Sequence, residues 1–182
     1  MSIIPLLAIH YLSYPCVKYT NINEGNTPLG FTCSGFVNFI LNEAGILVPN
    51  LHTYEQFDRF GILVHDGLQK SGDLVFWSKY GFKPTHVEFY VTRGKLSEIL
   101  DMDYNIKKDI INGFLKDAIG NEFTIGSHGK YESVVALNEL ERKVISPDEK
   151  YSHFPQLYNI NPIGFKRPAV LKEGKKYQEI WI

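Results

Sequence analysis

The stretch PLGFTCSGFV, residues 28–37, decides the fold of this chain. From Cys33 onward, apolar residues recur at helical spacing as far as residue 44. Thr32 stands where a helix N-cap is needed, and Gly45 stands where a helix ends. The sequence therefore predicts a loop that delivers Cys33 to the first turn of a helix over residues 33–44.

A cysteine in that position suits nucleophilic chemistry. The unpaired backbone N–H groups and the helix dipole at an N-terminus favour a negative charge, and a thiolate is one. Such a site lowers the pKa of a cysteine and raises its reactivity. The alternative for this local pattern is a cysteine that serves as a small core residue.

After this helix the sequence period changes. Runs rich in β-branched and aromatic residues predict strands, and helical spacing returns between two of them, over residues 97–119. Helices followed by a run of strands predict an α+β fold with an antiparallel sheet. The expected strands cover residues 73–77, 86–92, 122–127, 133–137 and 163–166, and the earlier expected helices cover 2–12 and 54–60.

His86 opens one of these strands and is the expected base. A thiol nucleophile needs a base, which is usually histidine, and the rim of a sheet is where such a side chain reaches a cleft. Glu88 lies two residues on, so it shares a strand face with His86. It is expected either to bind a cationic substrate group or to orient the base.

The ordered motifs resemble those of NlpC-type peptidases. The resemblance runs from about residue 5 to 168 and rests on more than the cysteine block. Its elements are Ala8, Pro15, the block 28–37, Gly45-Ile46 with Pro49, Gly72-Asp73-Leu74-Val75-Phe76-Trp77, His86-Val87-Glu88-Phe89-Tyr90 and Gly164-Phe165-Lys166-Arg167-Pro168.

The resemblance implies a papain-like fold in which the cysteine helix packs on the antiparallel sheet that carries the histidine. It implies a cysteine peptidase that cleaves peptide or amide bonds of bacterial peptidoglycan. Cys33 would attack the carbonyl, and His86 would take the thiol proton and later protonate the leaving amine. The backbone N–H of Cys33 would donate to the oxyanion.

The resemblance implies several candidates for the residue that orients His86. The family supplies it from the next strand, often as a histidine, and strict alignment places Gly126 there. His128, two residues on, shares that face and is the expected third catalytic residue. Glu88 and a backbone carbonyl are the alternatives.

Other departures concern the substrate. Thr32 replaces an aspartate, and both residue types cap helices. Cys16 replaces a substrate-facing aromatic in the turn after Pro15. Cys16, Ser34 and Glu88 are therefore the expected substrate-binding residues. A different acyl substrate, or a catalytically silent binding domain such as a phage-tail component, remains the alternative function.

The composition of the chain excludes some classes of function. The formal net charge of −1 offers no basic field for nucleic acid, and two cysteines are too few for a disulfide framework or a zinc motif. We expect no cofactor and no metal, and a peptidoglycan-derived peptide as partner. The N-terminus does not read as a signal peptide, and no run is long enough to span a bilayer. The domain is expected over residues 1–168, with a helical insertion at about 94–121 and an ambiguous tail at 169–182.

Overall fold

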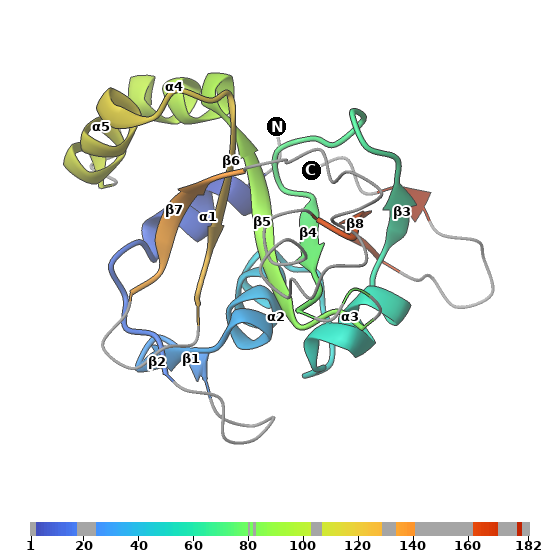
Figure 1. Ribbon diagram of the computed structural model, residues 1–182. Helices are drawn as coiled ribbons and strands as arrows, with labels where there is room; N and C mark the ends of the chain where they lie inside the picture. Colours follow the sequence, from blue (N-terminus) through green and yellow to red (C-terminus); the bar gives the residue numbers. More distant parts are fainter. Residues whose placement is uncertain are drawn as a thin grey trace.

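A six-stranded antiparallel sheet forms the centre of the computed structural model (Figure 1). The structure describes residues 3–17, 25–79, 81, 83–102, 107–128, 134–140, 162–170 and 178–179. The strand order is β3-β8-β4-β5-β6-β7. These strands are β3 (Ile62–Val64), β4 (Leu74–Trp77), β5 (His86–Thr92), β6 (Glu122–Gly126), β7 (Ala136–Glu139) and β8 (Gly164–Arg167). The α+β class with an antiparallel sheet is confirmed.

Helices α1 (Ile4–His10) and α2 (Cys33–Glu43) pack on one face of this sheet, against β5 and β6. Their apolar side chains join those of alternate strand residues in the main core, to which β5 contributes Val87, Phe89 and Val91. His86 and Glu88 therefore point to the other face, because side chains alternate along a strand. A smaller apolar cluster around Val75, Trp77 and Tyr90 lies on that face.

Helix α2 begins as its sequence predicts. The Thr32 hydroxyl accepts a hydrogen bond from the Gly35 backbone N–H at 3.1 Å, which is N-cap geometry. Beyond the last turn, Gly45 takes a positive φ of 79°, a conformation that favours glycine. The cap at Thr32 places Cys33 at the first helical position.

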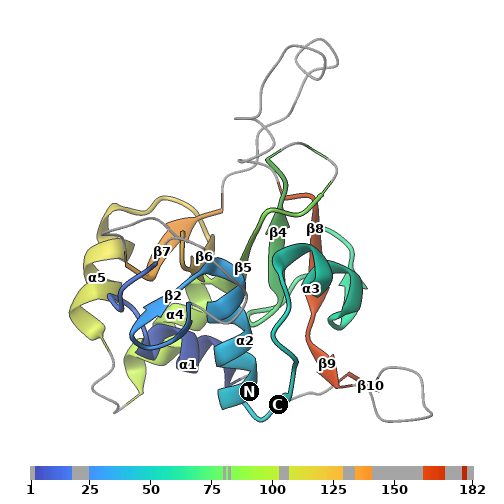
Figure 2. The same ribbon diagram turned by 90° about the horizontal axis from the view of Figure 1, so that it is seen from below.

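The described residues of the expected helical insertion at about 94–121 include two helices. Helix α4 (Arg93–Asp101) starts directly after β5, and α5 (Lys108–Asp117) follows. The Arg93 guanidinium donates to carbonyls at and beyond the end of α5, which ties the two helices together. Both lie at the far end of β5 from His86, roughly 20 Å along a seven-residue strand (Figures 1 and 2). The two helices therefore lie away from Cys33 and do not cover that residue. Helix α4 contacts β5 of the sheet and α5.

Several expected boundaries are wrong in detail. The strand expected at 133–137 corresponds to β7, which starts three residues later, at Ala136. Val134 forms only an isolated bridge, with Pro15. The loop expected over 20–31 contains a short hairpin, β1 (Asn26–Thr27) with β2 (Gly30–Phe31). β3 was not expected. The tail contains β9 (Ala169–Val170) paired with β10 (Gln178–Glu179), and its residues 171–177 and 180–182 lie outside the described part. Among the described residues, no helix has the length and apolar character to cross a membrane.

Candidate active site

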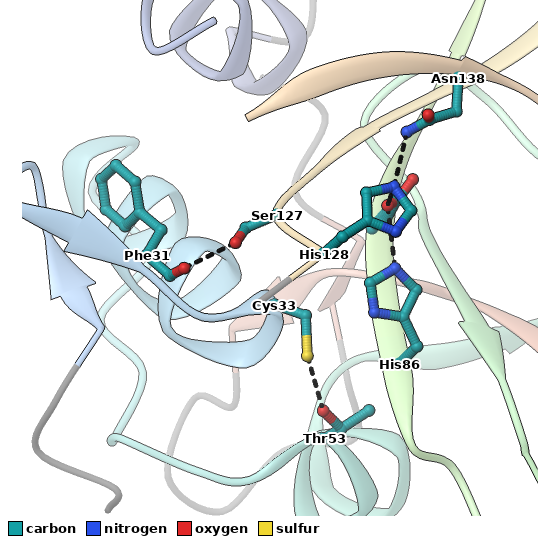
Figure 3. A network of polar contacts seen from close by, with 8 residues as sticks. Phe31, Cys33, Thr53, His86, Ser127, His128 and Asn138 are labelled. Atoms are coloured by element: carbon teal, nitrogen blue, oxygen red, sulfur yellow. Dashed lines mark hydrogen bonds and ion pairs between the residues drawn. The ribbon is translucent and has the colours of Figure 1, made fainter. Parts of the chain in front are cut away.

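A cleft of about 570 Å³ opens where the starts of α2, α3 and β5 meet. Helix α3 (Thr53–Arg59) follows α2 and brings its first turn toward Cys33. The cleft is lined by residues 32–34, 52–54, 83–86 and His128. Figure 3 shows the side chains of Cys33, Thr53, His86 and His128 gathered there. The fold thus brings all three expected catalytic residues to one cleft.

Cys33 lies among groups that stabilise a thiolate. Its Sγ is 3.5 Å from the Thr53 Oγ1, and the side chain of His86 and the backbone N–H of Ser34 lie near enough to stabilise its charged form. Burial opposes the charged thiolate, but the hydrogen bond and charge of His86, helped by Thr53 and Ser34, lower the pKa of Cys33 below its ordinary value. A thiol of this kind is a nucleophile at lower pH than a free cysteine.

His86 uses its two ring nitrogens differently. Its Nε2 lies 2.9 Å from Glu88 Oε1, which leaves Nδ1 for the thiol of Cys33 (Figure 3). Burial disfavours the imidazolium, but the hydrogen bonds and negative charges of Cys33 and Glu88 outweigh it and raise the pKa of His86 to about 10. The geometry therefore favours an imidazolium held between a thiolate and a carboxylate.

Glu88 reaches this position because β6 makes room for it. The side chain is only 2% exposed, and it packs over Gly126 of the neighbouring strand. A Cβ atom at Gly126 would lie 2.8 Å from the Glu88 Cδ, closer than real Cβ contacts. Burial raises the pKa of the Glu88 carboxyl, but His86, with smaller contributions from His128 and Thr124, brings it below its ordinary value. The absence of a side chain at Gly126 on β6 thus leaves the space that the Glu88 side chain on β5 fills.

His128 meets the carboxylate rather than the base. Its Nε2 lies 3.1 Å from Glu88 Oε1 and 3.1 Å from Asn138 Nδ2, and its ring lies beside that of His86 with centroids 5.1 Å apart. Ser127 holds the strand end in place, since its hydroxyl donates to the Phe31 carbonyl at 2.6 Å (Figure 3). The Nε2 of His86 donates its hydrogen bond to Glu88, the alternative in the sequence interpretation, and His128 is the second partner of that glutamate.

The expected substrate-binding residues have different surroundings. Ser34 lines the cleft. Glu88 is buried beneath it and is bonded to His86. Cys16 is 5% exposed and lies in the main core, outside the lining of the cleft. Both cysteines are free thiols.

Sequence reasoning missed the opposite wall of the cleft. Thr53 contacts the thiol, and the Lys83 ammonium lies 3.7 Å above the Tyr54 ring, which also stacks on His52. No motif marks these residues, because they come from the start of a short helix and from a loop.

The chain is similar to proteins of known family and to solved structures. The model of the NlpC/P60 family matches residues 22–128, which include Cys33, His86 and His128. The chain is 35% identical over 91 residues to a probable endopeptidase p60 of Listeria welshimeri, covering 49% of this chain and 16% of that protein. The corresponding Listeria monocytogenes protein is also 35% identical over 91 residues, with 49% and 17% covered. The chain spans about a sixth of the length of these relatives.

Solved structures share the fold. A crystal structure of an NlpC/P60 family protein from Bacillus cereus superposes with a TM-score of 0.53 at 21% identity, covering 87% of this chain and 36% of that chain. The NlpC/p60 domain of the peptidoglycan hydrolase SagA superposes with a TM-score of 0.50 at 18% identity, covering 90% and 94%. At such identities the likeness concerns the fold alone, which is the α+β papain-like fold expected from the sequence. Because the family model matches more than half of its residues, the chain belongs to the NlpC/P60 family.

Proposed function

We propose that this protein is a cysteine endopeptidase or amidase that hydrolyses peptide bonds in the stem peptides of bacterial peptidoglycan. The observation that carries the proposal is the contact chain of Cys33, His86 and Glu88 at the edge of an open cleft. Family membership and the printed names of the relatives, endopeptidase p60 and peptidoglycan hydrolase SagA, support the same class of reaction.

In the proposed reaction the Cys33 thiolate attacks the carbonyl carbon of the scissile bond. The S–C bond forms while the carbonyl π electrons move to oxygen, where the Cys33 backbone N–H donates to the oxyanion at the start of α2. The imidazolium of His86 then protonates the leaving amine, the C–N bond breaks as the carbonyl re-forms, and a thioester remains. Water attacks the thioester with His86 as its base, which releases the acid and regenerates the thiol.

Glu88 has the role of a positioning residue in this scheme. It accepts a hydrogen bond from the Nε2 of His86, which fixes the ring so that Nδ1 faces Cys33. Its buried negative charge also stabilises the imidazolium that forms with the thiolate. The carboxylate thus replaces the group that the family draws from the next strand.

The lining of the cleft suits an acidic peptide. Lys83 and three histidines, His52, His86 and His128, are among the lining residues, and none of the lining residues that the structure describes is acidic. A carboxylate next to the scissile bond would therefore meet favourable charge. Stem peptides carry such carboxylates.

The test is incubation of the purified protein with purified peptidoglycan, followed by mass spectrometry of the released fragments. Cleavage at one defined stem-peptide bond is expected, and Cys33→Ala should release nothing while retaining its thermal midpoint. Absence of fragments from the unmodified protein, or equal release by Cys33→Ala, contradicts the proposal. Turnover of a different acyl compound would keep the thiol chemistry and replace the substrate.

A further inference from the structure

The back of the cleft contains three groups of the kind that bind transition metals. His86, Glu88 and His128 each offer one ligand atom, and these atoms lie within 4.8 Å of one another. Two come from the same face of β5 at positions i and i+2, and the third follows β6. The sequence interpretation found no zinc motif because the set is assembled across two strands and contains no cysteine.

Both imidazole ligand atoms lie close to the carboxylate ligand atom. The Nε2 atoms of His86 and His128 lie 2.9 Å and 3.1 Å from the same atom, Oε1 of Glu88. In tetrahedral zinc sites with bonds near 2.0–2.1 Å, neighbouring ligand atoms are roughly 3.3 Å apart. Small side-chain rotations would therefore bring the two nitrogen–oxygen spacings to those of a metal site, and the two nitrogens, which lie within 4.8 Å of each other, would have to take a similar spacing.

If the Nε2 of His128 carries no proton, its surroundings leave a place for a cation. Its Nε2 faces the Asn138 amide nitrogen, a donor, and the Glu88 carboxylate, an acceptor, each at 3.1 Å. If Nε2 accepts from Asn138, it has no proton, and its lone pair then faces a carboxylate lone pair. A cation stabilises that arrangement. Glu88 is buried, but His128 is 43% exposed, so an ion can enter from the solvent.

We propose that this protein binds a zinc ion, or a transition-metal ion of similar preference, through His86, Glu88 and His128. Two imidazoles and one carboxylate are a donor set for zinc rather than for calcium or magnesium, which take oxygen ligands. Binding replaces the Nε2 proton of His86 by a metal–nitrogen bond and releases that proton to solvent. Cys33 is no ligand of this site, because it faces the other nitrogen of His86.

Bound zinc would stop the proposed peptidase reaction, and this consequence rests on the proposed function. With Nε2 on the metal, the neutral imidazole carries its remaining proton on Nδ1. That nitrogen cannot accept the proton of the thiol or of the attacking water, because it would first have to become an imidazolate. The metal is thus a reversible inhibitor, relieved by a chelator.

The decisive measurement is zinc affinity, obtained by competition with a chromophoric chelator, and it needs no turnover. Cys33→Ala should bind one zinc ion as well as the unmodified protein does. In the Cys33→Ala background, adding His128→Ala or Glu88→Gln should weaken binding at least tenfold. Adding His65→Ala, at an exposed histidine outside the cleft, should leave it unchanged. Zinc should also raise the thermal midpoint of Cys33→Ala and of its His65→Ala form, but not of its His128→Ala form.

Two results would overturn this site. Loss of zinc binding in Cys33→Ala alone would place the metal on the thiol and the Nδ1 of His86. Unchanged affinity in the Cys33→Ala/His128→Ala protein would place it elsewhere. If zinc binds as expected but the protein releases nothing from peptidoglycan, the metal site stands and the proposed function fails.

Discussion

Asp73 and Glu88 are two equally buried carboxylates, each 2% exposed, and they have opposite surroundings. Asp73 precedes β4 and receives two hydrogen bonds from the Arg167 guanidinium, at 2.9 Å and 3.0 Å, and one from the Lys70 backbone N–H. Glu88, in the middle of β5, meets the imidazoles of His86 and His128. The first carboxylate faces a permanent cation, and the second faces groups that exchange protons.

This difference indicates that Asp73 stabilises the fold, whereas Glu88 takes part in the chemistry of the site. A guanidinium keeps its charge at every pH that a protein survives, so the Asp73–Arg167 pair fastens β8 to the start of β4 without any change of state. An imidazole gains and loses a proton near neutral pH, and neighbouring charges move that point. Glu88 therefore controls the proton on His86, whereas Asp73 controls only the position of a strand.

Among the variants that test this comparison, Glu88→Gln is expected to have the largest effect. The amide keeps the shape of the side chain but removes the charge that supports the imidazolium, so kcat/KM should fall roughly 10²- to 10⁴-fold, as for other base-orienting carboxylates. The alkaline limb of the pH profile, expected near the pKa of His86 at about 10, should move to lower pH. The direction follows because the protonated base is lost as pH rises, and the missing carboxylate no longer favours it.

His128→Ala is the matched comparison for Glu88→Gln. The alanine variant removes the outer partner of the carboxylate and leaves the contact between Glu88 and His86 intact, so its loss of kcat/KM should be the smaller one. This order reverses the one expected from sequence, where His128 was placed next to the base. A larger loss in His128→Ala, or an unmoved alkaline limb in Glu88→Gln, would show that Glu88 does not govern the proton on His86.

Asp73→Asn should give the opposite result, a loss of stability without a loss of catalysis. Removing one partner of a buried ion pair leaves the other charge uncompensated, which costs about 3 kcal/mol. In a chain of this size that corresponds to a fall in the thermal midpoint of roughly 6–12 °C. At low temperature, where the variant remains folded, kcat/KM should stay near that of the unmodified protein. Denaturant unfolding and initial rates on the same samples make the comparison. A hundredfold loss of activity in folded Asp73→Asn would end the distinction between the two carboxylates.

The sequence predicts the pair of Cys33 and His86, but it offers Glu88 only as an alternative to His128 for the residue that orients the base. The helix at Cys33 and the strand at His86 follow from local pattern, a cap and a change of period, and the structure confirms both. The contact of Glu88 with Gly126 depends on the register between β5 and β6, which strand patterns do not give. In the alignment, Gly126 stands where the family has the residue that orients the base, so that residue is missing from β6. In the structure, the absence of a side chain at Gly126 leaves the space that Glu88 occupies. Thr53 was beyond reach for the same reason, since it meets Cys33 only through tertiary packing of α3.

A smaller effect is expected from Gly126→Ala, which tests the space that Glu88 needs. The added methyl group would lie 2.8 Å from the Glu88 Cδ, so the carboxylate must shift away from His86, and kcat/KM should fall about tenfold. A paired exchange sharpens the test. Glu88→Gly combined with Gly126→His places an imidazole from β6 in the vacated space, and the double variant should exceed Glu88→Gly in activity. A double variant no better than Glu88→Gly would mean that the two positions are not interchangeable sources of the third group.

The smallest expected effect belongs to Thr53→Val, which acts on the thiolate rather than on the base. Valine keeps the shape of the buried side chain and removes the hydroxyl that lies 3.5 Å from Cys33 Sγ. Helix α3 should survive, because its first turn is held by the Glu55 carboxylate on the His52 backbone N–H. Loss of one donor to a charged sulfur, about 1 kcal/mol, should raise the pKa of Cys33 and slow its alkylation by iodoacetamide several-fold at neutral pH.

Thr53→Ser restores the hydroxyl and should restore most of that alkylation rate, while Cys16 stays slow in every variant because it is buried in the core. In Thr53→Val the alkaline limb set by His86 should stay near that of the unmodified protein, whereas in Glu88→Gln it should move. The two sides of the ion pair can thus be changed separately: Thr53 acts on the sulfur, and Glu88 acts on the nitrogen. Identical alkylation rates in Thr53→Val and the unmodified protein would mean that the Thr53 hydroxyl does not stabilise the thiolate. His86 and the start of α2 would then be enough to stabilise it.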